Sequence, residues 1–229
     1  MNRLSIVMPV LNEAQEIEQA LHALQPLRAG GHEVIVVDGG SVDDSAGLAA
    51  PLADRVLSTE RGRANQMNHG AKAARGDVFL FLHADTRLPE QASQLIVEEM
   101  ARTGVQWGRF DVRIDSSHVL LWLVGALMNL RSRFNGICTG DQAIFVSRRL
   151  FVDVGGFPPI ALMEDVALSR KLRRASPPLR VSSPARTSAR RWKRDGVVRT
   201  ILLMWWLRLA YLFGASPAHL ARLYDGRSR

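Results

Sequence analysis

The sequence predicts an α/β protein in which helices cover both faces of a doubly wound, mostly parallel sheet. The first observation is that short β-branched runs alternate with segments whose apolar residues recur at helical spacing. The second is that the run 77–82, DVFLFL, is apolar on both faces, which is typical of a parallel strand covered by helices. The chain has 229 residues, 47% of them hydrophobic, so we expect a single core with a C-terminal tail.

Strands are expected at residues 4–8, 33–37, 55–58 and 77–82. Helices are expected at residues 14–27, 63–74 and from Pro89 to about residue 102. The first helix carries Ile17, Leu21 and Leu24 on one face, and Pro89 suits the first turn of the third helix. The Ser- and Pro-rich segment 176–188 is expected to be a loop that precedes the C-terminal helices.

The chain has no sequence feature of a secreted protein. Cys138 is its only cysteine, so no disulfide can form within the chain, which favours a reduced, cytoplasmic setting. The N-terminal apolar run ends at Met8, which is too short for a signal peptide. The apolar stretches 119–130 and 200–214 are shorter than the ~20 residues that span a bilayer. We therefore expect a cytoplasmic protein without a transmembrane helix.

The stretch 200–214 leaves open a position at the inner face of the membrane. Trp205 and Trp206 lie near a basic segment and would suit a helix in the interface of an anionic membrane. The alternative is an amphipathic helix that closes the core. Arg199 and Arg208 are nine residues apart, which predicts opposite sides of a helix and argues against a membrane helix with one apolar face.

The net charge of +8 is unevenly distributed along the chain. Residues 1–60 hold three arginines and nine acids, a net charge of −6, whereas residues 170–199 hold eleven Lys/Arg and one acid, a net charge of +10. The basic segment could meet a nucleic acid, an anionic membrane or a phosphorylated ligand, or it could be a solvated basic face. The acidic N-terminal part fits a nucleic-acid partner poorly, so none is expected.

Polar residues follow three of the expected strands, at residues 9–13, 38–44 and 83–86. In a doubly wound sheet the ligand binds beyond the carboxyl ends of the strands, so these segments should face one crevice. Asp38 could direct its carboxylate at a ligand or form an Asp-Gly turn with Gly39. The chain contains neither G-x-G-x-x-G nor G-x-x-x-x-G-K-[ST], so dinucleotide and P-loop chemistry are not expected.

His83 and Asp85 are separated by one residue directly after the buried strand. Both could meet one divalent cation, because carboxylate oxygens suit Mg²⁺ or Mn²⁺ that bridges phosphate groups. Alternatively, His83 is satisfied by hydrogen bonds and Asp85 caps the helix that follows.

Glu164 and Asp165 are adjacent carboxylates at the expected start of a helix. One interpretation is that they stabilise the positive end of the helix dipole. The other is that one of them, close to the crevice, acts as a general base and takes a proton from an attacking hydroxyl.

Taken in order, the sequence motifs of the chain resemble those of family 2 glycosyltransferases with the A-type fold. These motifs are PVLNE (9–13), VVDGGS (36–41), GRANQMNHGAKAARGD (62–77), LHADT (82–86), GDQAIFV (140–146), GGFP (155–158) and MED (163–165). The match runs from residue 4 to about residue 192. It is most similar to the bacterial subgroup labelled arsenosugar-biosynthesis glycosyltransferases, which also carries R-R-W, here residues 190–192, before C-terminal hydrophobic helices.

The resemblance implies an inverting transfer of a sugar from a nucleoside-diphosphate sugar, with UDP-sugars favoured, to an unidentified acceptor hydroxyl. It also implies a divalent metal, Mn²⁺ or Mg²⁺. We accordingly expect residues 1–192 to form the transferase domain, and residues 193–229 to form a helical appendage packed on it or lying at a membrane surface.

The resemblance also assigns roles to individual residues. Nucleotide contacts fall to Pro9, Asn12, Glu13, Asp38, Gly40, Arg63, Gln66 and Asn68. Asp85 and His83 take the metal positions, Asp165 is the general base and Glu164 stands beside it. Contacts with the diphosphate or the acceptor fall to Gln142, Arg190, Arg191 and Trp192.

Three positions depart from the family pattern. Gly39 replaces the second Asp of D-D-G-S, and His83 replaces the first Asp of D-x-D. Ser188 replaces the Gln of Q-x-x-R-W, which argues against a polymerising synthase. The competing function from another class is a non-catalytic module that binds nucleotide-sugars; the presence of Asp165 argues against it.

Overall fold

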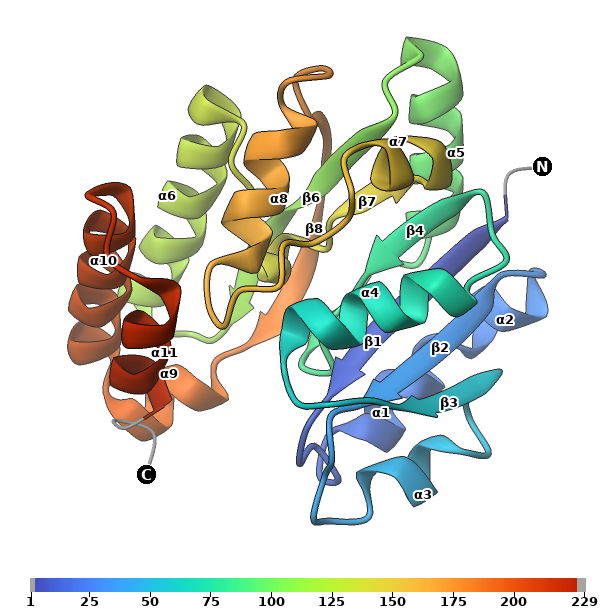
Figure 1. Cartoon of the computed structure of the whole chain (residues 1–229), viewed down its shortest axis with the longest axis horizontal. Helices are drawn as coiled ribbons and strands as arrows, with labels where there is room; N and C mark the ends of the chain where they lie inside the picture. The colour runs from blue at the N-terminus through green and yellow to red at the C-terminus, as the bar shows by residue number, and fades with distance from the viewer. Residues whose placement is uncertain (1–2, 226–229) are drawn as a thin grey trace.

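The computed structural model describes residues 3–225 and contains one eight-stranded sheet with helices on both faces (Figure 1). The strand order is β3-β2-β1-β4-β7-β6-β8-β5. The strands are β1 (Leu4–Val10), β2 (Glu33–Asp38), β3 (Arg55–Ser58), β4 (Val78–Phe81), β5 (Thr86–Arg87), β6 (Trp107–Asp115), β7 (Phe145–Ser147) and β8 (Leu179–Ser188).

The helices lie between these strands and after the last of them. They are α1 (Ile17–His22), α2 (Gln25–Ala29), α3 (Ser45–Ala49), α4 (Arg63–Ala73), α5 (Ala92–Thr103), α6 (Val119–Asn135), α7 (Arg148–Asp153), α8 (Glu164–Leu172), α9 (Arg190–Asp195), α10 (Val197–Leu212) and α11 (Pro217–Asp225). A short 3₁₀ turn, η1 (Gly140–Gln142), precedes β7.

The predicted α/β class is confirmed, and the four predicted strands form the parallel half of the sheet, β3-β2-β1-β4. Successive residues of β1 point to opposite faces, so Ile6 packs in one buried cluster and Val7 in the other. Because these strands are parallel, their carboxyl ends share one edge of the sheet, where the functional loops begin.

The other half of the sheet is mixed. β7 pairs antiparallel with β4 and with β6, β8 pairs parallel with β6, and β5 pairs antiparallel with β8. Among the described residues four of the seven strand pairings are parallel, so the predicted mostly parallel sheet is confirmed. The antiparallel pairings are those of β7 and β5, which the sequence does not predict because an apolar run does not show in which direction its neighbour runs.

Two predicted helix boundaries are wrong at prolines. The expected helix 14–27 is divided into α1 and α2, since Pro26 has no N–H to continue the hydrogen-bond ladder of α1. Helix α5 begins at Ala92 rather than at Pro89. The N–H of Ala92 donates to the carbonyl of Pro89 at 3.0 Å, so Pro89 belongs to the preceding turn.

The predicted loop 176–188 is also wrong, because most of it forms β8. Leu179, Val181, Ala185 and Thr187 are buried in alternation, as expected for a strand with one covered face. The register with β6 shifts between Val181 and Ala185, and such an irregularity is where a strand tolerates a proline.

The C-terminal helices pack against the loop that leads into α8. Leu207 of α10 and Leu220 of α11 are fully buried in a cluster with Leu162 and Met163. Helix α10 also lies beside α6 at one end of the molecule (Figure 1). None of the helices within residues 3–225 is long and apolar enough to cross a membrane.

Candidate active site

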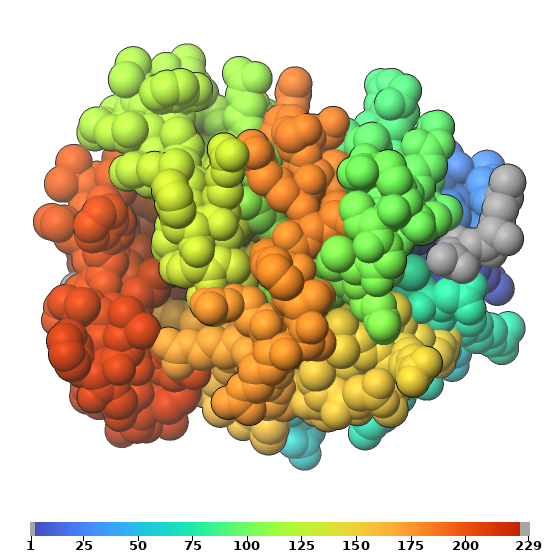
Figure 2. All heavy atoms as spheres, turned by 90° about the horizontal axis from the view of Figure 1, so that it is seen from above, coloured from blue at the N-terminus to red at the C-terminus, as the bar shows by residue number. Residues whose placement is uncertain are grey.

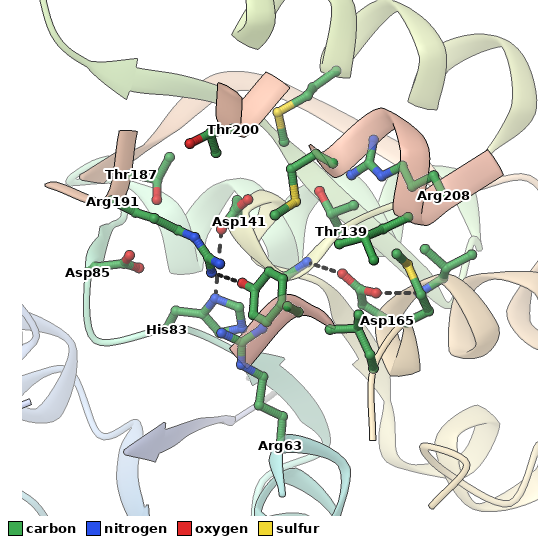
Figure 3. A pocket seen from close by; sticks show the side chains of 18 of the residues that line it. Arg63, His83, Asp85, Thr139, Asp141, Asp165, Thr187, Arg191, Thr200 and Arg208 are labelled. Atoms are coloured by element: carbon green, nitrogen blue, oxygen red, sulfur yellow. Dashed lines mark hydrogen bonds and ion pairs between the residues drawn. The ribbon is translucent and has the colours of Figure 1, made fainter. Parts of the chain in front are cut away.

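Two adjoining cavities of about 160 and 240 Å³ lie at the carboxyl edge of the parallel strands. Both are lined by Arg63, His83, Asp85 and Glu164. Figure 3 looks into the smaller cavity, which is also lined by Asp165. The structure thus brings the strand-end loops and the start of α8 to one place.

His83 is held by a neighbour that the sequence prediction missed. Its Nδ1 lies 3.8 Å from Oδ1 of Asp141. Burial works to lower the pKa of His83, but the Asp141 carboxylate outweighs it, so the pKa is raised above its usual value. The ring also lies directly against Gly140, where a Cβ would stand 2.3 Å from Cε1. Position 140 therefore has room only for glycine.

Gly140 also connects this pair to Asp165. Its N–H donates to Oδ2 of Asp165 at 2.8 Å, and the N–H of Val166 donates to Oδ1 at 2.7 Å. Met163 precedes α8 in the left-handed region, with φ 68°, and this turns the chain so that Asp165 enters the cavity. Figure 3 shows Asp165 on one side of the cavity and Asp85 on the other.

The two carboxylates at the start of α8 are electrostatically unusual. Burial raises the pKa of Asp165, although the hydrogen bonds from Gly140 and Val166 oppose it. Burial, and after it the charge of Asp165, raises the pKa of Glu164. A carboxylate with a raised pKa next to a cavity is suited to accept a proton near neutral pH.

The residues fit a metal that arrives with a ligand better than a metal held by protein alone. Within residues 3–225 no group of three or more His, Cys, Asp or Glu side chains could enclose an ion. Asp85 accepts one weak hydrogen bond, from Oγ1 of Thr86 at 3.2 Å, and lines both cavities. Mg²⁺ typically uses one or two carboxylates together with phosphate oxygens and water, and Asp85 can supply such a carboxylate.

The first loop lines the larger cavity through Pro9 and Glu13, together with Gln66 of α4. The Gln66 side chain is buried and donates to the carbonyls of Val10 and Val37, each at 2.8 Å, so it also ties β1 to β2.

Several residues predicted to contact the nucleotide make hydrogen bonds that hold loops in place, and their nucleotide contacts stay predictions. The Asp38 carboxylate accepts from the N–H groups of Gly40 and Ser41, which is the Asp-Gly turn considered above. Asn12 accepts from the N–H of Val42 at 2.8 Å. Neither Asp38 nor Asn12 lines the two cavities.

Two further predicted residues do not line the two cavities. Asn68 exchanges two hydrogen bonds with the backbone of Phe157 and so fixes the GGFP loop to α4. Gln142 is fully buried, and its amide lies 3.3 Å from Oγ of Ser132. Both support the loops that shape the site.

The basic residues after β8 divide into two roles. Arg190 lies outside the two cavities and forms an ion pair with Glu13 at 2.7 Å. Arg191 and Trp192 line the smaller cavity. The Arg191 guanidinium lies 3.8 Å from the ring centroid of Tyr224, a residue of α11 that lines both cavities and that the sequence prediction missed.

The model for glycosyl transferase family 2 matches residues 5–148. The chain belongs to this family. That result confirms the resemblance to this family of glycosyltransferases, while the subgroup remains a prediction.

Curated relatives extend the comparison. The chain is 26% identical over 187 residues to poly-beta-1,6-N-acetyl-D-glucosamine synthase of Staphylococcus aureus, covering 74% of this chain and 45% of the relative. It is 32% identical over 164 residues to a PGL/p-HBAD biosynthesis glycosyltransferase of Mycobacterium bovis, covering 67% and 62%. The chain therefore spans about half to two thirds of the length of these relatives.

Solved structures share the fold. Staphylococcus aureus TarS 1–349 in complex with UDP-GlcNAc matches with a TM-score of 0.66 and 15% identity, covering 81% of this chain and 58% of that chain. Glucosyl-3-phosphoglycerate synthase of Mycobacterium tuberculosis, in complex with Mn²⁺, UDP and glucosyl-3-phosphoglycerate, matches with a TM-score of 0.62 and 23% identity, covering 81% of this chain and 72% of that chain. These likenesses confirm the A-type glycosyltransferase fold.

Proposed function

We propose that this chain transfers a glycosyl group from a nucleoside-diphosphate sugar, with UDP-sugars favoured, to an acceptor hydroxyl with inversion of the sugar carbon. The observation that carries the proposal is the placement of Asp165 and Asp85 on opposite sides of one cavity (Figure 3). Structural neighbours in complex with UDP-GlcNAc, or with UDP and Mn²⁺, support the choice of donor.

Asp165 would act as the general base. Its carboxylate is fixed by the N–H groups of Gly140 and Val166, so it faces the cavity in one orientation. It would take the proton of the acceptor hydroxyl as that oxygen attacks the sugar carbon and the bond to the diphosphate breaks. Such assistance contributes roughly 10²–10⁴ in rate. Attack from the face opposite the leaving group inverts the configuration.

The opposite side of the cavity would receive the diphosphate. Arg63 and Arg191 both line it and can stabilise the negative charge that develops on the leaving group. Asp85, with His83 beside it, would hold a divalent cation on the phosphate oxygens. When bound, Mn²⁺ or Mg²⁺ would further neutralise the leaving diphosphate.

The alternative, a non-catalytic module that binds nucleotide-sugars, requires the same donor cavity without a base. The raised pKa of Asp165 beside the cavity favours the enzyme. A cytoplasmic location and the absence of a nucleic-acid partner remain predictions.

A donor screen tests the proposal. UDP-, GDP- and other nucleotide-sugars would be titrated into the protein with and without Mn²⁺, and slow hydrolysis of the bound donor would be followed. We expect Mn²⁺-dependent binding of one class of donor and release of its nucleoside diphosphate. Absence of binding to every nucleotide-sugar would refute the proposal, and binding without any hydrolysis or transfer would favour the binding module.

A further inference from the structure

Exposed apolar side chains gather on two neighbouring helices. Within residues 3–225, the large hydrophobic side chains that remain exposed lie on α6, on α10 or directly after α10, with two exceptions, Val42 and Val152. We call this surface the α6–α10 face. It comprises Val119, Leu120, Trp122, Leu123, Leu127, Leu130, Phe134, Val198, Leu202, Trp205, Trp206, Leu209, Leu212 and Phe213. Figures 1 and 2 show the two helices side by side at one end of the molecule.

Helix α10 is clearly two-sided. Thr200 and Leu207 are buried on one side, and the exposed apolar residues form a stripe about 120° wide on the other. Arg199 is exposed and falls on one border of this stripe. Arg208 falls near the other border, but it lines the smaller cavity (Figure 3). Neither arginine interrupts the apolar surface.

The charge of the α6–α10 face has one sign. Neither helix contains Asp or Glu, and Arg133 and Arg199 are exposed on them. Their other two arginines do not lie on this face: Arg131 has buried guanidinium nitrogens, and Arg208 lines the smaller cavity. Helix α9, which precedes α10, adds three arginines, a lysine and one acid, Asp195, which pairs with Arg191 and Arg194. A second copy of this chain would bring like charges together on such a face, whereas an anionic surface would neutralise them.

We propose that the α6–α10 face docks on the surface of an anionic lipid bilayer. Trp205 and Trp206, 65% and 49% exposed, would lie among the head groups, a position that tryptophan prefers. The exposed Arg133 and Arg199 would contact lipid phosphates while their apolar stems stay on the apolar surface. This docking does not depend on the proposed function.

The docked face would also place the catalytic cavity beside the lipid. Met128 of α6, together with Met204 and Leu207 of α10, lines the smaller cavity from the side opposite to the exposed stripe. The same two helices therefore separate the proposed membrane surface from the cavity that contains Asp165.

Co-sedimentation with vesicles tests the inference. We expect the wild type to bind vesicles of equal parts phosphatidylglycerol and phosphatidylcholine, to bind pure phosphatidylcholine much less, and to be released as salt screens the charges. The double variant Trp205→Ser/Trp206→Ser should bind at least about tenfold more weakly, since two aromatic rings no longer enter the interface. Arg133→Gln/Arg199→Gln should weaken binding by about tenfold or more at low salt.

Val42→Ser/Val152→Ser is the matched control, because it removes two exposed apolar side chains from elsewhere. It should bind like the wild type, and circular dichroism should confirm that every variant is folded. A wild type that stays in the supernatant would overturn the inference. So would equal losses in the control and the tryptophan variant. A wild-type dimer that Trp205→Ser/Trp206→Ser converts to monomer, without vesicle binding, would assign the face to a second copy instead.

Discussion

At the scale of single residues, the carboxylates of Asp165 and Asp85 differ in the hydrogen bonds that they accept. Asp165 accepts two backbone hydrogen bonds and has a raised pKa, whereas Asp85 accepts one weak hydrogen bond and faces both cavities. The first arrangement fixes the direction of a base, and the second leaves oxygen atoms available for a cation. Replacement of the two carboxylates should therefore have different effects on donor binding and on turnover.

Asp165→Asn should separate binding from turnover. Asparagine keeps the size of the side chain but cannot take a proton, so we expect donor affinity close to that of the wild type and kcat lowered by about 10² or more. Glu164→Gln should lower kcat less. Steady-state kinetics with the identified donor gives both values, and equal turnover in Asp165→Asn and wild type would exclude Asp165 as the base.

Asp85→Ala should instead abolish metal-dependent donor binding. The substitution removes the carboxylate that would hold the cation on the diphosphate, whereas His83→Ala leaves that oxygen ligand in place and should weaken binding less. Calorimetric titration of the donor with and without Mn²⁺ measures the difference. Undiminished Mn²⁺-dependent affinity in Asp85→Ala would contradict the assignment.

At the scale of elements, the turn η1 couples the two sides of the site. Gly140 contacts the His83 ring and donates its N–H to Asp165, and the next residue, Asp141, pairs with His83. A single displacement of this turn would disturb the metal side and the base side together.

Gly140→Ala should therefore lower both donor affinity and kcat, because a Cβ cannot fit 2.3 Å from the His83 ring without moving the turn. Gly125→Ala in α6 is the control. Its Cβ would lie 3.4 Å from the nearest atom, and alanine is the better helix former, so activity should be unchanged. Full activity of Gly140→Ala would contradict the idea that this turn positions both His83 and Asp165.

A second coupling between elements is the ion-pair group between β6 and β8. Asp111 pairs with Arg109, which is 1% exposed, and with Arg180 of β8. Burial works to raise the pKa of Asp111, but the bonds to Arg180 and Arg109 outweigh it, so the pKa lies below its usual value. The charged form of Asp111 is therefore the one that the fold favours.

Asp111→Asn should destabilise the protein by about 3–5 kcal/mol, because the buried Arg109 loses its counter-charge. Asp115→Asn, an exposed position on the same strand, should change the free energy of unfolding by less than about 0.5 kcal/mol. Since the folded-state pKa is lowered, the stabilisation by Asp111 is present above the pKa of the unfolded chain, about 3.9, and is lost as the pH falls through the folded pKa. Urea unfolding at several pH values should show a constant difference at neutral pH that shrinks only in acid.

At the scale of the whole molecule, the C-terminal helices support the site although they follow the family motifs. Leu207 packs against Leu162 and Met163, the residues that lead into Glu164 and Asp165. Stability of the C-terminal helices and the position of the base are therefore linked through one small core.

Leu207→Ala should lower the free energy of unfolding by about 2–5 kcal/mol, the usual cost of a cavity at a fully buried leucine, and should also lower kcat. Leu212→Ala, at a position 66% exposed, should change stability by less than about 0.5 kcal/mol. Thermal unfolding and kinetics of the two variants make the comparison. A stable but inactive Leu207→Ala would indicate a direct role in the cavity rather than the predicted packing role.

The sequence by itself determined the α/β class, the four parallel strands, the family and the segments that form the site. These features are local: apolar periodicity, strand ends and short motifs such as LHADT and MED lie within a few neighbouring residues. The predicted boundaries of α2 and α5 were wrong because of nearby prolines. The sequence shows that a proline has no N–H, but it does not show which turn accommodates the missing hydrogen bond.

The tertiary structure decided what depends on distant partners. In the folded chain Asn68 and Gln142 form hydrogen bonds with distant segments, and Asp141 pairs with His83. Tyr224 of the last helix lines the site. It also set the direction of the strands beyond β4 and the side of α10 that is buried. A side chain's type limits what it can bind, but which neighbour it meets is fixed only when segments far apart in the chain pack together.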